Sequence, residues 1–207
     1  WPNKARNWLP LVDHPYDKST SDFIIVAPNH YQVISNGLLV EETNLDRNLK
    51  RTHCIILLFL FSFNLISKDP YPKNPNIDIL NYSFELHLND SNDVIYGEAN
   101  IKLTIKPGEK QIRLDLISKT TDNKGMSVHE VMFNNKKISF SHVKNVLKIN
   151  TEDFEYDVND ILKIKYSGIP ITGLIIGDNM HGDRTFFSDN WPNKARNWLP
   201  LVDHPYD

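Results

Sequence analysis

From Asn81 onward, apolar and polar residues alternate with a period of two. Between Asn81 and Leu88, four apolar side chains are separated by polar ones; the apolar residues are Tyr82, Phe84, Leu86 and Leu88. In an extended chain this alternation places the apolar side chains on one face of a strand and the polar ones on the other. The same pattern returns at residues 101–106, 112–116 and 162–166. It predicts antiparallel strands with one face buried and one in water.

The front of the chain also has the pattern of strands. Phe23–Ala27 predicts one strand, and Tyr31–Ser35 and Leu38–Glu42 predict a hairpin around the Asn36-Gly37 turn. No segment shows an apolar stripe with helical spacing. Turn residues separate the predicted strands at 91–93, 107–108, 122–125 and 134–135. We therefore expect an all-β fold, an antiparallel sheet or sandwich of roughly eight to ten strands.

The two ends of the chain carry the same sequence. Trp1–Asp17 and Trp191–Asp207 are identical at every position. Packing repeats drift between copies and recur several times, so one perfect copy at each end indicates something else. We interpret the chain as a linear reading of a circular order, in which residues 77–207 are followed by residues 18–53. In this interpretation 77–207 is the N-terminal part of one β domain and 1–53 is its C-terminal part, permuted to the front.

An apolar run separates these two parts. Cys54–Ile66 reads CIILLFLFSFNLI and is followed by a stretch rich in Pro and Asn up to residue 76. The run fits the core of a signal peptide, about 7–15 residues, and is shorter than the roughly 20 residues that cross a bilayer. A buried strand or helix is the alternative. We expect residues 54–76 to be a signal-like segment and linker, the parent protein to be secreted or periplasmic, and the chain to have no stable membrane span.

Composition excludes some classes of protein. The net charge is −3 and no basic stripe is present, which argues against nucleic acid as a partner. Cys54 is the only cysteine, so there is no disulfide framework, and its apolar surroundings predict a buried side chain rather than a nucleophile.

Motifs for catalysis are incomplete. His129-Glu130 begins like the zinc motif H-E-x-x-H, but Phe133 replaces the second histidine. Asp203-His204, and its duplicate Asp13-His14, place a carboxylate next to an imidazole. Neither pair has the third residue that a metal site or a catalytic triad needs. The glycine-containing bend at 177–182, with His181, Asp183 and Arg184 around it, is followed by no helix start and resembles a turn more than a phosphate-binding loop. We expect no catalytic, cofactor-binding or metal-binding residues in this chain.

The segment that joins the two parts resembles a known family. Read from Arg184 to Asp207 and on from Lys18 to Pro28, it is similar to the N-terminal β domain of zinc aminopeptidases of the aminopeptidase N type, the gluzincin aminopeptidases. That domain carries an A-R-x-x-x-P-x-x-D-x-P pattern, and the matching positions here are Ala195, Arg196, Pro200, Asp203 and Pro205. The resemblance covers nearly the whole chain apart from residues 54–76, and it is colinear only in the circular order.

The resemblance implies a saddle-like, non-catalytic domain. In the family, zinc and its H-E-x-x-H helix belong to the following catalytic domain, which would be the partner of this chain. The parent would use a zinc-activated water to remove N-terminal residues from peptides. The resemblance thus implies zinc in the parent and only indirect contact between this chain and the peptide substrate.

The resemblance also points to residues near the substrate or the domain interface. In the family, a Glu or Gln before the Pro of an E-P-x-x-A-R motif contacts the free amine of the peptide, and Trp191 occupies that position here. Asp189 is the nearest carboxylate that could replace it. We prefer an interpretation in which Trp191, Trp198 and Pro200 form an aromatic wedge against the catalytic domain. The interface-adjacent candidates are Asp189, Trp191, Arg196, Trp198 and Asp203.

Two questions stay open at this point. A freestanding β-sandwich module that binds carbohydrate or protein is the alternative function, and an exposed strip of aromatic side chains would favour it. The two identical segments cannot occupy one groove together. Because Trp191–Asp207 directly follows the strand-rich body, we expect it to hold the groove and Trp1–Asp17 to be the looser copy.

Overall fold

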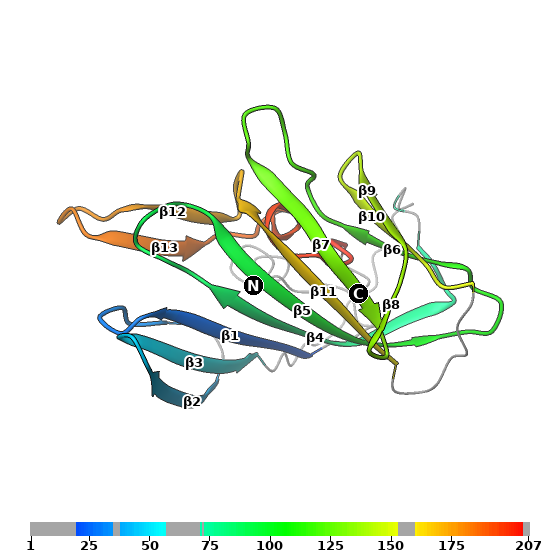
Figure 1. Cartoon of the computed structure of the whole chain (residues 1–207), viewed down its shortest axis with the longest axis horizontal. Helices are drawn as coiled ribbons and strands as arrows, with labels where there is room; N and C mark the ends of the chain where they lie inside the picture. Colours follow the sequence, from blue (N-terminus) through cyan, green and yellow to red (C-terminus); the bar gives the residue numbers. More distant parts are fainter. Residues whose placement is uncertain (1–19, 35–37, 57–70, 72, 153–159, 205–207) are drawn as a thin grey trace, which may run out of the picture.

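The computed structural model describes residues 20–34, 38–56, 71, 73–152 and 160–204 of the 207-residue chain, and Figure 1 shows their arrangement. The fold is all-β, as predicted. The described strands are β1 (Thr20–Pro28), β2 (Leu38–Leu45), β3 (Leu49–Ile56), β4 (Ile77–His87), β5 (Ile95–Ile105), β6 (Gln111–Asp115), β7 (Gly125–Phe133), β8 (Lys136–Lys137), β9 (Phe140–Val143), β10 (Val146–Asn150), β11 (Asp160–Ile169), β12 (Leu174–Asp178) and β13 (Arg184–Ser188). One short 3-10 helix, η2, spans Ala195–Asn197.

The strands form three sheets. The main sheet has eight strands in the order β2-β3-β1-β4-β5-β11-β7-β8, and its long central strands twist through the middle of Figure 1. A second sheet has the order β6-β10-β9, and β12 and β13 form a two-stranded hairpin that projects on the left of the view. Neighbouring strands are antiparallel except β1 and β4, which are parallel.

The period of two explains why the central strands bury one face. Every second side chain of β5 is buried from Ile95 to Ile105, and the residues between them are exposed or half-buried. The buried faces of β4, β5, β7 and β11 form one core cluster with Ile112 and Leu114 of β6 and with Leu147 and Ile149 of β10. Apolar contact between the main and second sheets is therefore the main source of stability for the body of the domain.

A glycine in β5 allows the largest of these side chains to fit. Tyr166 of β11 lies directly opposite Gly97, and a Cβ atom at residue 97 would come within 2.3 Å of the tyrosine ring. Such a contact is too short for any side chain, so only glycine permits this packing. The Tyr166 hydroxyl is buried without a hydrogen-bond partner, and burial raises the pKa of this phenol.

The front part of the chain joins the main sheet. β1 pairs in parallel with β4 from Thr20↔Asn81 to Val26↔His87, and β3 and β2 extend the sheet beyond it. The circular order predicts one β domain, with the strands of residues 21–42 in the same sheet as those of 81–166; β1 and β2 do share a sheet with β4, β5, β7 and β11, whereas β6, β9 and β10 form a second sheet. The β1–β4 pair differs from the antiparallel pairing that alternation predicted, because β4 is separated from β1 by β2, β3 and a further connection and can run in the same direction.

The predicted hairpin at residues 31–42 is wrong. Tyr31–Ile34 forms no strand, while Asn36-Gly37 lies outside the described residues. Leu38–Leu45 instead pairs with β3, and the turn between them contains Arg47 and Asn48 in the left-handed conformation. The turn of this hairpin is formed by Asp46, Arg47 and Asn48. The prediction placed the turn at Asn36-Gly37 instead, because Asn-Gly is the more common hairpin turn sequence.

The predicted boundary at residue 54 also needs correction. β3 continues to Ile56, and Cys54, Ile55 and Ile56 pair with β1 residues 21–23. Cys54 is buried, in agreement with the prediction for its side chain. The first three residues of the apolar run are therefore part of the sheet. Residues 57–66, the rest of the run, lie outside the described residues, and no helix within the described part of the chain is long and apolar enough to cross a membrane.

Candidate functional site

The segment after β13 fills a groove between the sheets. We call Trp191–Asp207 the second copy and Trp1–Asp17 the first copy; the structure describes the second copy up to His204, and the first copy lies outside the described residues. From Trp191 the chain turns through η2 and then runs extended past β6. Trp198 and Leu199 are buried and belong to the main core cluster.

Main-chain hydrogen bonds hold the second copy in this groove. Asp115 and Leu201 exchange two of them, with N···O distances of 2.8 and 3.2 Å, and the amide of Ile117 donates to the carbonyl of Arg196 at 2.8 Å. The amide of Val202 donates to the hydroxyl of Tyr82 at 3.1 Å. The segment thus satisfies backbone groups at the end of β6, whose one neighbour among the described strands is β10.

A cluster of charges lies at the end of this groove. Asp115 is 1% exposed and pairs with Arg113 at 3.0 Å and with Arg196 at 3.6 Å. Its carboxylate also accepts hydrogen bonds from the hydroxyl of Tyr71 and from the amide of Asp203. Each of these partners stabilises a buried negative charge that would otherwise be costly.

Arg196 and Asp203, the Arg and Asp of the family pattern, face each other. The Arg196 Nε atom donates to Asp203 Oδ2 at 2.7 Å, and Nη2 donates to the Asp203 carbonyl at 3.0 Å. Burial would lower the pKa of Arg196, but the hydrogen bond and charge of Asp203 raise it above its ordinary value. The guanidinium therefore stays charged. The geometry makes this pair a clamp that closes the segment on itself and on Asp115.

Of the other three predicted residues, Trp198 is buried, Asp189 is half-buried and Trp191 is exposed. Trp198 is 3% exposed, and its indole N–H donates to Asn190 Oδ1 at 2.9 Å. A Cβ atom on Gly173, whose φ is +83°, would approach the Trp198 ring to 3.0 Å and the Lys194 carbonyl to 2.4 Å. Trp198 therefore packs inside this domain, and Pro200 is buried with it, so neither side chain lies on a wedge toward a neighbour.

Asp189 and Trp191 lie at the turn that leads into the groove. Asp189 Oδ2 accepts a hydrogen bond from Lys194 Nζ at 2.8 Å, and Oδ1 accepts the amide of Trp191 at 3.4 Å. The Lys194 contact lowers the pKa of Asp189, which stays ionised. The Trp191 side chain is 44% exposed. Of the aromatic residues in the second copy that the structure describes, it is the one available to a neighbouring surface.

The β12–β13 hairpin has two apolar faces. Ile176 lies opposite Phe186 on the face that packs against the core, and Ile175 lies opposite Phe187 on the other face. The side chains of Ile175 and Phe187 are 52% and 62% exposed. Arg184 fixes the inner face, because its Nη2 atom donates to Asp93 at 2.6 Å. The outer face is thus an apolar surface on a firmly attached hairpin.

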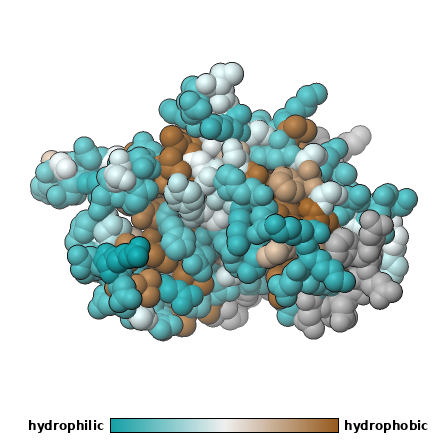
Figure 2. All heavy atoms as spheres, in the orientation of Figure 1, coloured by the Kyte–Doolittle hydropathy of each residue, from teal (hydrophilic) through white to brown (hydrophobic). Residues whose placement is uncertain are grey.

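The surface around this hairpin is mostly polar, as it is over much of the molecule. Figure 2 shows a largely hydrophilic face, with patches of hydrophobic side chains that include one at the lower left, where Figure 1 places β1, β2 and β3. Exposed apolar residues of that region are in β2, namely Leu38, Leu39, Val40 and Leu45. Exposed apolar side chains therefore gather at two places, the edge strand β2 and the outer face of the hairpin.

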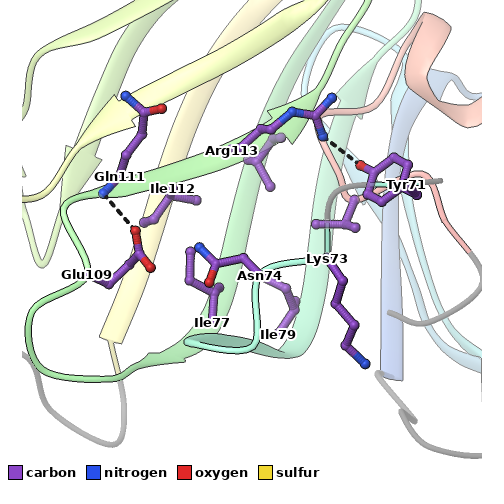
Figure 3. A pocket seen from close by; sticks show the side chains of 11 residues that line it. Tyr71, Lys73, Asn74, Ile77, Ile79, Glu109, Gln111, Ile112 and Arg113 are labelled. Carbon is purple, nitrogen blue, oxygen red and sulfur yellow. Dashed lines mark hydrogen bonds between the residues drawn. The ribbon is translucent and has the colours of Figure 1, made fainter. Parts of the chain in front are cut away.

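A cavity of about 330 Å³ opens between β6 and the start of β4 (Figure 3). Tyr71 and Arg113 are joined by a 2.9 Å hydrogen bond on one side of it, and Glu109 accepts a hydrogen bond from the amide of Gln111 at 3.3 Å on the other. Burial would raise the pKa of Glu109, but hydrogen bonds from Asn74, Asn76 and two backbone amides lower it. The cavity wall carries an ionised carboxylate and a lysine, Lys73, and offers no Ser, Cys or His nucleophile.

The remaining candidate motifs have structural surroundings. His129 lies in β7, and its Nε2 atom is 2.7 Å from the hydroxyl of Ser167. His181 and Asp183 lie in the turn between β12 and β13. The backbone amides of both residues donate hydrogen bonds to the side-chain oxygen Oδ1 of Asn179. His204 stacks on Tyr71 with ring centroids 4.5 Å apart. Within the described residues, no three His, Cys, Asp or Glu side chains are grouped as a metal site.

Sequence reasoning missed Asp115 and the outer face of the hairpin. Asp115 occupies a polar position in an alternating strand and was expected in water; Leu201–Asp203, which covers it, is remote in sequence. The hairpin left a signal that could have been used. Apolar residues at 174–176 and 186–187 flank a bend with Gly177 and Gly182, which is the pattern of two strands around a turn.

These features describe a β domain whose last segment closes a groove and whose hairpin presents an apolar face. The model of the peptidase M1 N-terminal domain family matches residues 2–54 and 79–207. The chain belongs to this family, and the match is to the non-catalytic N-terminal domain. A search of curated proteins gave no match.

The solved structures that are similar to this chain are those of larger proteins. Yeast leukotriene A4 hydrolase in complex with bestatin is 17% identical with a TM-score of 0.53, and 67% of this chain covers 24% of that chain. The native leukotriene A4 hydrolase of Saccharomyces cerevisiae is 18% identical with a TM-score of 0.51, covering 62% of this chain and 21% of that one. An M1 zinc metallopeptidase of Deinococcus radiodurans is 18% identical with a TM-score of 0.47, covering 63% and 30%. This chain thus spans less than a third of each.

Proposed function

We propose that this chain is the accessory β domain of a zinc aminopeptidase, and that it docks on the catalytic domain through the outer face of the β12–β13 hairpin and Trp191. The family match supports the assignment to an M1 peptidase. In this proposal the parent removes N-terminal residues from peptides, and its zinc, catalytic base and substrate amine site belong to the catalytic domain.

The exposed pair Ile175 and Phe187 is the observation that carries the docking proposal. These side chains lie directly opposite each other and are more than half exposed, whereas Ile176 and Phe186 of the same strands are partly buried against the core. Apolar surface of this kind on a rigid hairpin is typical of a protein interface. Trp191 follows the end of β13 by three residues, and its exposed side chain offers a partner an aromatic ring close in sequence to the hairpin.

This surface favours a protein partner over carbohydrate. Sugar-binding modules present aromatic rings in a strip, whereas this face combines the aliphatic Ile175 with Phe187 and Trp191. Asp189 is engaged by Lys194, so we propose that it shapes the turn and places Trp191. The role of Arg196, Asp203 and Trp198 in docking is indirect: they hold the second copy to the domain and do not contact the partner.

The test uses the catalytic domain of the parent protein, produced separately and titrated with this chain. Phe187→Asp places a charge in the apolar face and is expected to weaken binding at least about tenfold, the effect of losing a central apolar contact. Val143→Asp is the matched control, since Val143 is 60% exposed on the distant β9 strand. Equal affinities for the two variants would contradict docking through this face of the hairpin. If the unsubstituted chain formed no complex, the catalytic domain would not be its partner.

We further propose that the chain has the permuted order described above and that the parent is secreted or periplasmic. The family model matches both parts of the chain and leaves residues 55–78 between them unmatched. Residues 57–66 keep the length of a signal-peptide core after β3 has taken the first residues of the apolar run. Sequencing the template across both ends tests the order: a circular template of one period is expected, and unrelated flanking sequence would contradict it.

A further inference from the structure

The groove that holds the second copy is bordered by two attachment points, one for each copy. We define the copy site as the groove formed by Tyr71, Tyr82, Asp115, Ile117 and Gly173, all of which contact the second copy. The second copy enters this site from β13, which ends at Ser188. Its attachment is therefore at its N-terminal end.

The first copy is attached to the same place through its C-terminal end. Asp17 is joined to β1 by Lys18 and Ser19, and β1 starts with Thr20 beside Asn81 and Ser21 beside Tyr82. The hydroxyl of that same Tyr82 receives the amide of Val202 in the copy site. One tyrosine side chain and one strand spacing of about 5 Å thus separate the start of β1 from the site.

The connection available to the first copy is long enough for this distance. Asp13 corresponds to Asp203, and residues 14–19 connect it to Thr20. Seven Cα–Cα steps can span up to about 23 Å, so Asp13 can reach the place of Asp203 while β1 stays in the sheet. The position of β1, rather than the length of the linker between β3 and β4, sets the distance from the first copy to the site. The length of the β3–β4 linker therefore does not keep the first copy away from the site.

We propose that the copy site is an exchangeable binding site for two segments of the same chain, and that the first copy occupies it in a fraction of the molecules. The identical sequence supplies the same side chains, with Arg6, Trp8 and Asp13 in the places of Arg196, Trp198 and Asp203. The second copy keeps one advantage. Asn190 and Asp189 lie outside the duplicated sequence, and they bond to Trp198 and Lys194.

The experiment follows the tryptophans of the full chain by ¹⁹F NMR after labelling with 5-fluorotryptophan. Trp8 and Trp198 are assigned from Trp8→Phe and Trp198→Phe. In Trp198→Ala, the Trp8 signal is expected to move to the buried position and become protected from a soluble relaxation agent. A Trp8 signal that remains at the solvent position in a folded Trp198→Ala chain would overturn the proposal.

Asn190→Ala provides a milder variant in which both indoles remain. It removes the bond between Asn190 and Trp198 and should increase the buried fraction of Trp8 at the expense of Trp198. An unchanged ratio of the buried signals would contradict exchange. The change should be the same at two protein concentrations, because the first copy comes from the same molecule; a dependence on concentration would show exchange between molecules and overturn this part of the proposal.

Thermal unfolding gives an independent readout. Trp8→Ala and Trp198→Ala together should lower Tm by about 10 °C, as expected for loss of a buried tryptophan in a domain of this size. Trp198→Ala alone should lose about half of that or less, because the first copy replaces the damaged one. Equal losses for the single and double variants would show that the first copy never enters the site.

Discussion

The centre of the main sheet and the copy site are both buried, but different interactions hold them. In the sheet, strands β4, β5 and β11 bury apolar side chains on every second residue, and one buried hydroxyl, that of Tyr166, has no partner. In the copy site, backbone amides and a charge cluster around Asp115 hold a segment without long strands. The sheet is thus tolerant of lost polar groups, whereas the copy site depends on them.

The largest effect should come from removing the buried carboxylate of the copy site. Asp115→Ala leaves Arg113 and Arg196 without their shared partner and should lower the free energy of unfolding by about 3 kcal/mol. Glu98→Ala is the control, because Glu98 pairs with Lys163 on the half-exposed outer face and should cost less than about 1 kcal/mol. Both are measured by urea unfolding. Similar losses would remove the distinction between the copy site and a surface ion pair.

A steric change tests the apolar side of the comparison. Gly97→Ala places a methyl group against the Tyr166 ring and should cost about 2 kcal/mol, the usual effect of overpacking a core. Gly177→Ala in β12 meets no atom within 4 Å and should change stability by less than about 0.5 kcal/mol. Thermal unfolding of the two variants compares them directly. A tolerated Gly97→Ala would mean that the core can rearrange around Tyr166.

Two tyrosines allow the same chemical change in both regions. Tyr166→Phe removes an unpartnered hydroxyl from the sheet core and should raise the free energy of unfolding by about 1 kcal/mol. Tyr82→Phe leaves the amide of Val202 without its acceptor and should lower it by about 1 kcal/mol. The opposite signs are the expected result in urea unfolding. The same sign for both would show that hydroxyl groups contribute alike in the two regions.

The smallest expected effect is a dependence on pH at His142, which lies beside the copy site. Burial lowers the pKa of His142, and the hydrogen bond to the Leu116 carbonyl at 2.9 Å offsets this only in part. The unfolded chain, with a His pKa of about 6.5, therefore binds a proton first as the pH falls, and stability is lost below that value. His142→Gln keeps a donor and should show a smaller loss of Tm between neutral and mildly acidic pH. An unchanged slope would exclude His142 as the cause.

Sequence patterns predicted the sheet better than the copy site. Alternation located β4, β5, β6 and β11, because each of these strands buries one face against a layer of its own domain. It did not locate the partner of β2, since the pairing of β2 with β3 depends on a turn with residues in the left-handed conformation. Local periodicity also could not show that the front of the chain joins β4 in parallel; the interpretation as a circular order predicted the shared sheet.

The candidate site was predicted in its residues and only partly in their roles. The family pattern led to Arg196 and Asp203, and the structure brings them together with Asp115. Trp198 was expected at an interface and is instead buried in the domain, because Gly173 leaves room for its ring. Trp198 is buried by segments that are far away in the sequence. The residues next to it in the sequence therefore could not predict its burial.

The most direct test of the account is an assay of the purified chain for aminopeptidase activity and bound zinc. The account predicts no release of a chromogenic amine from amino-acid anilides and less than about one tenth of a zinc ion per chain, since a catalytic zinc needs three protein ligands and an open position. Chelator-sensitive release of the amine, with about one zinc ion per chain, would contradict the assignment of this chain as a non-catalytic domain.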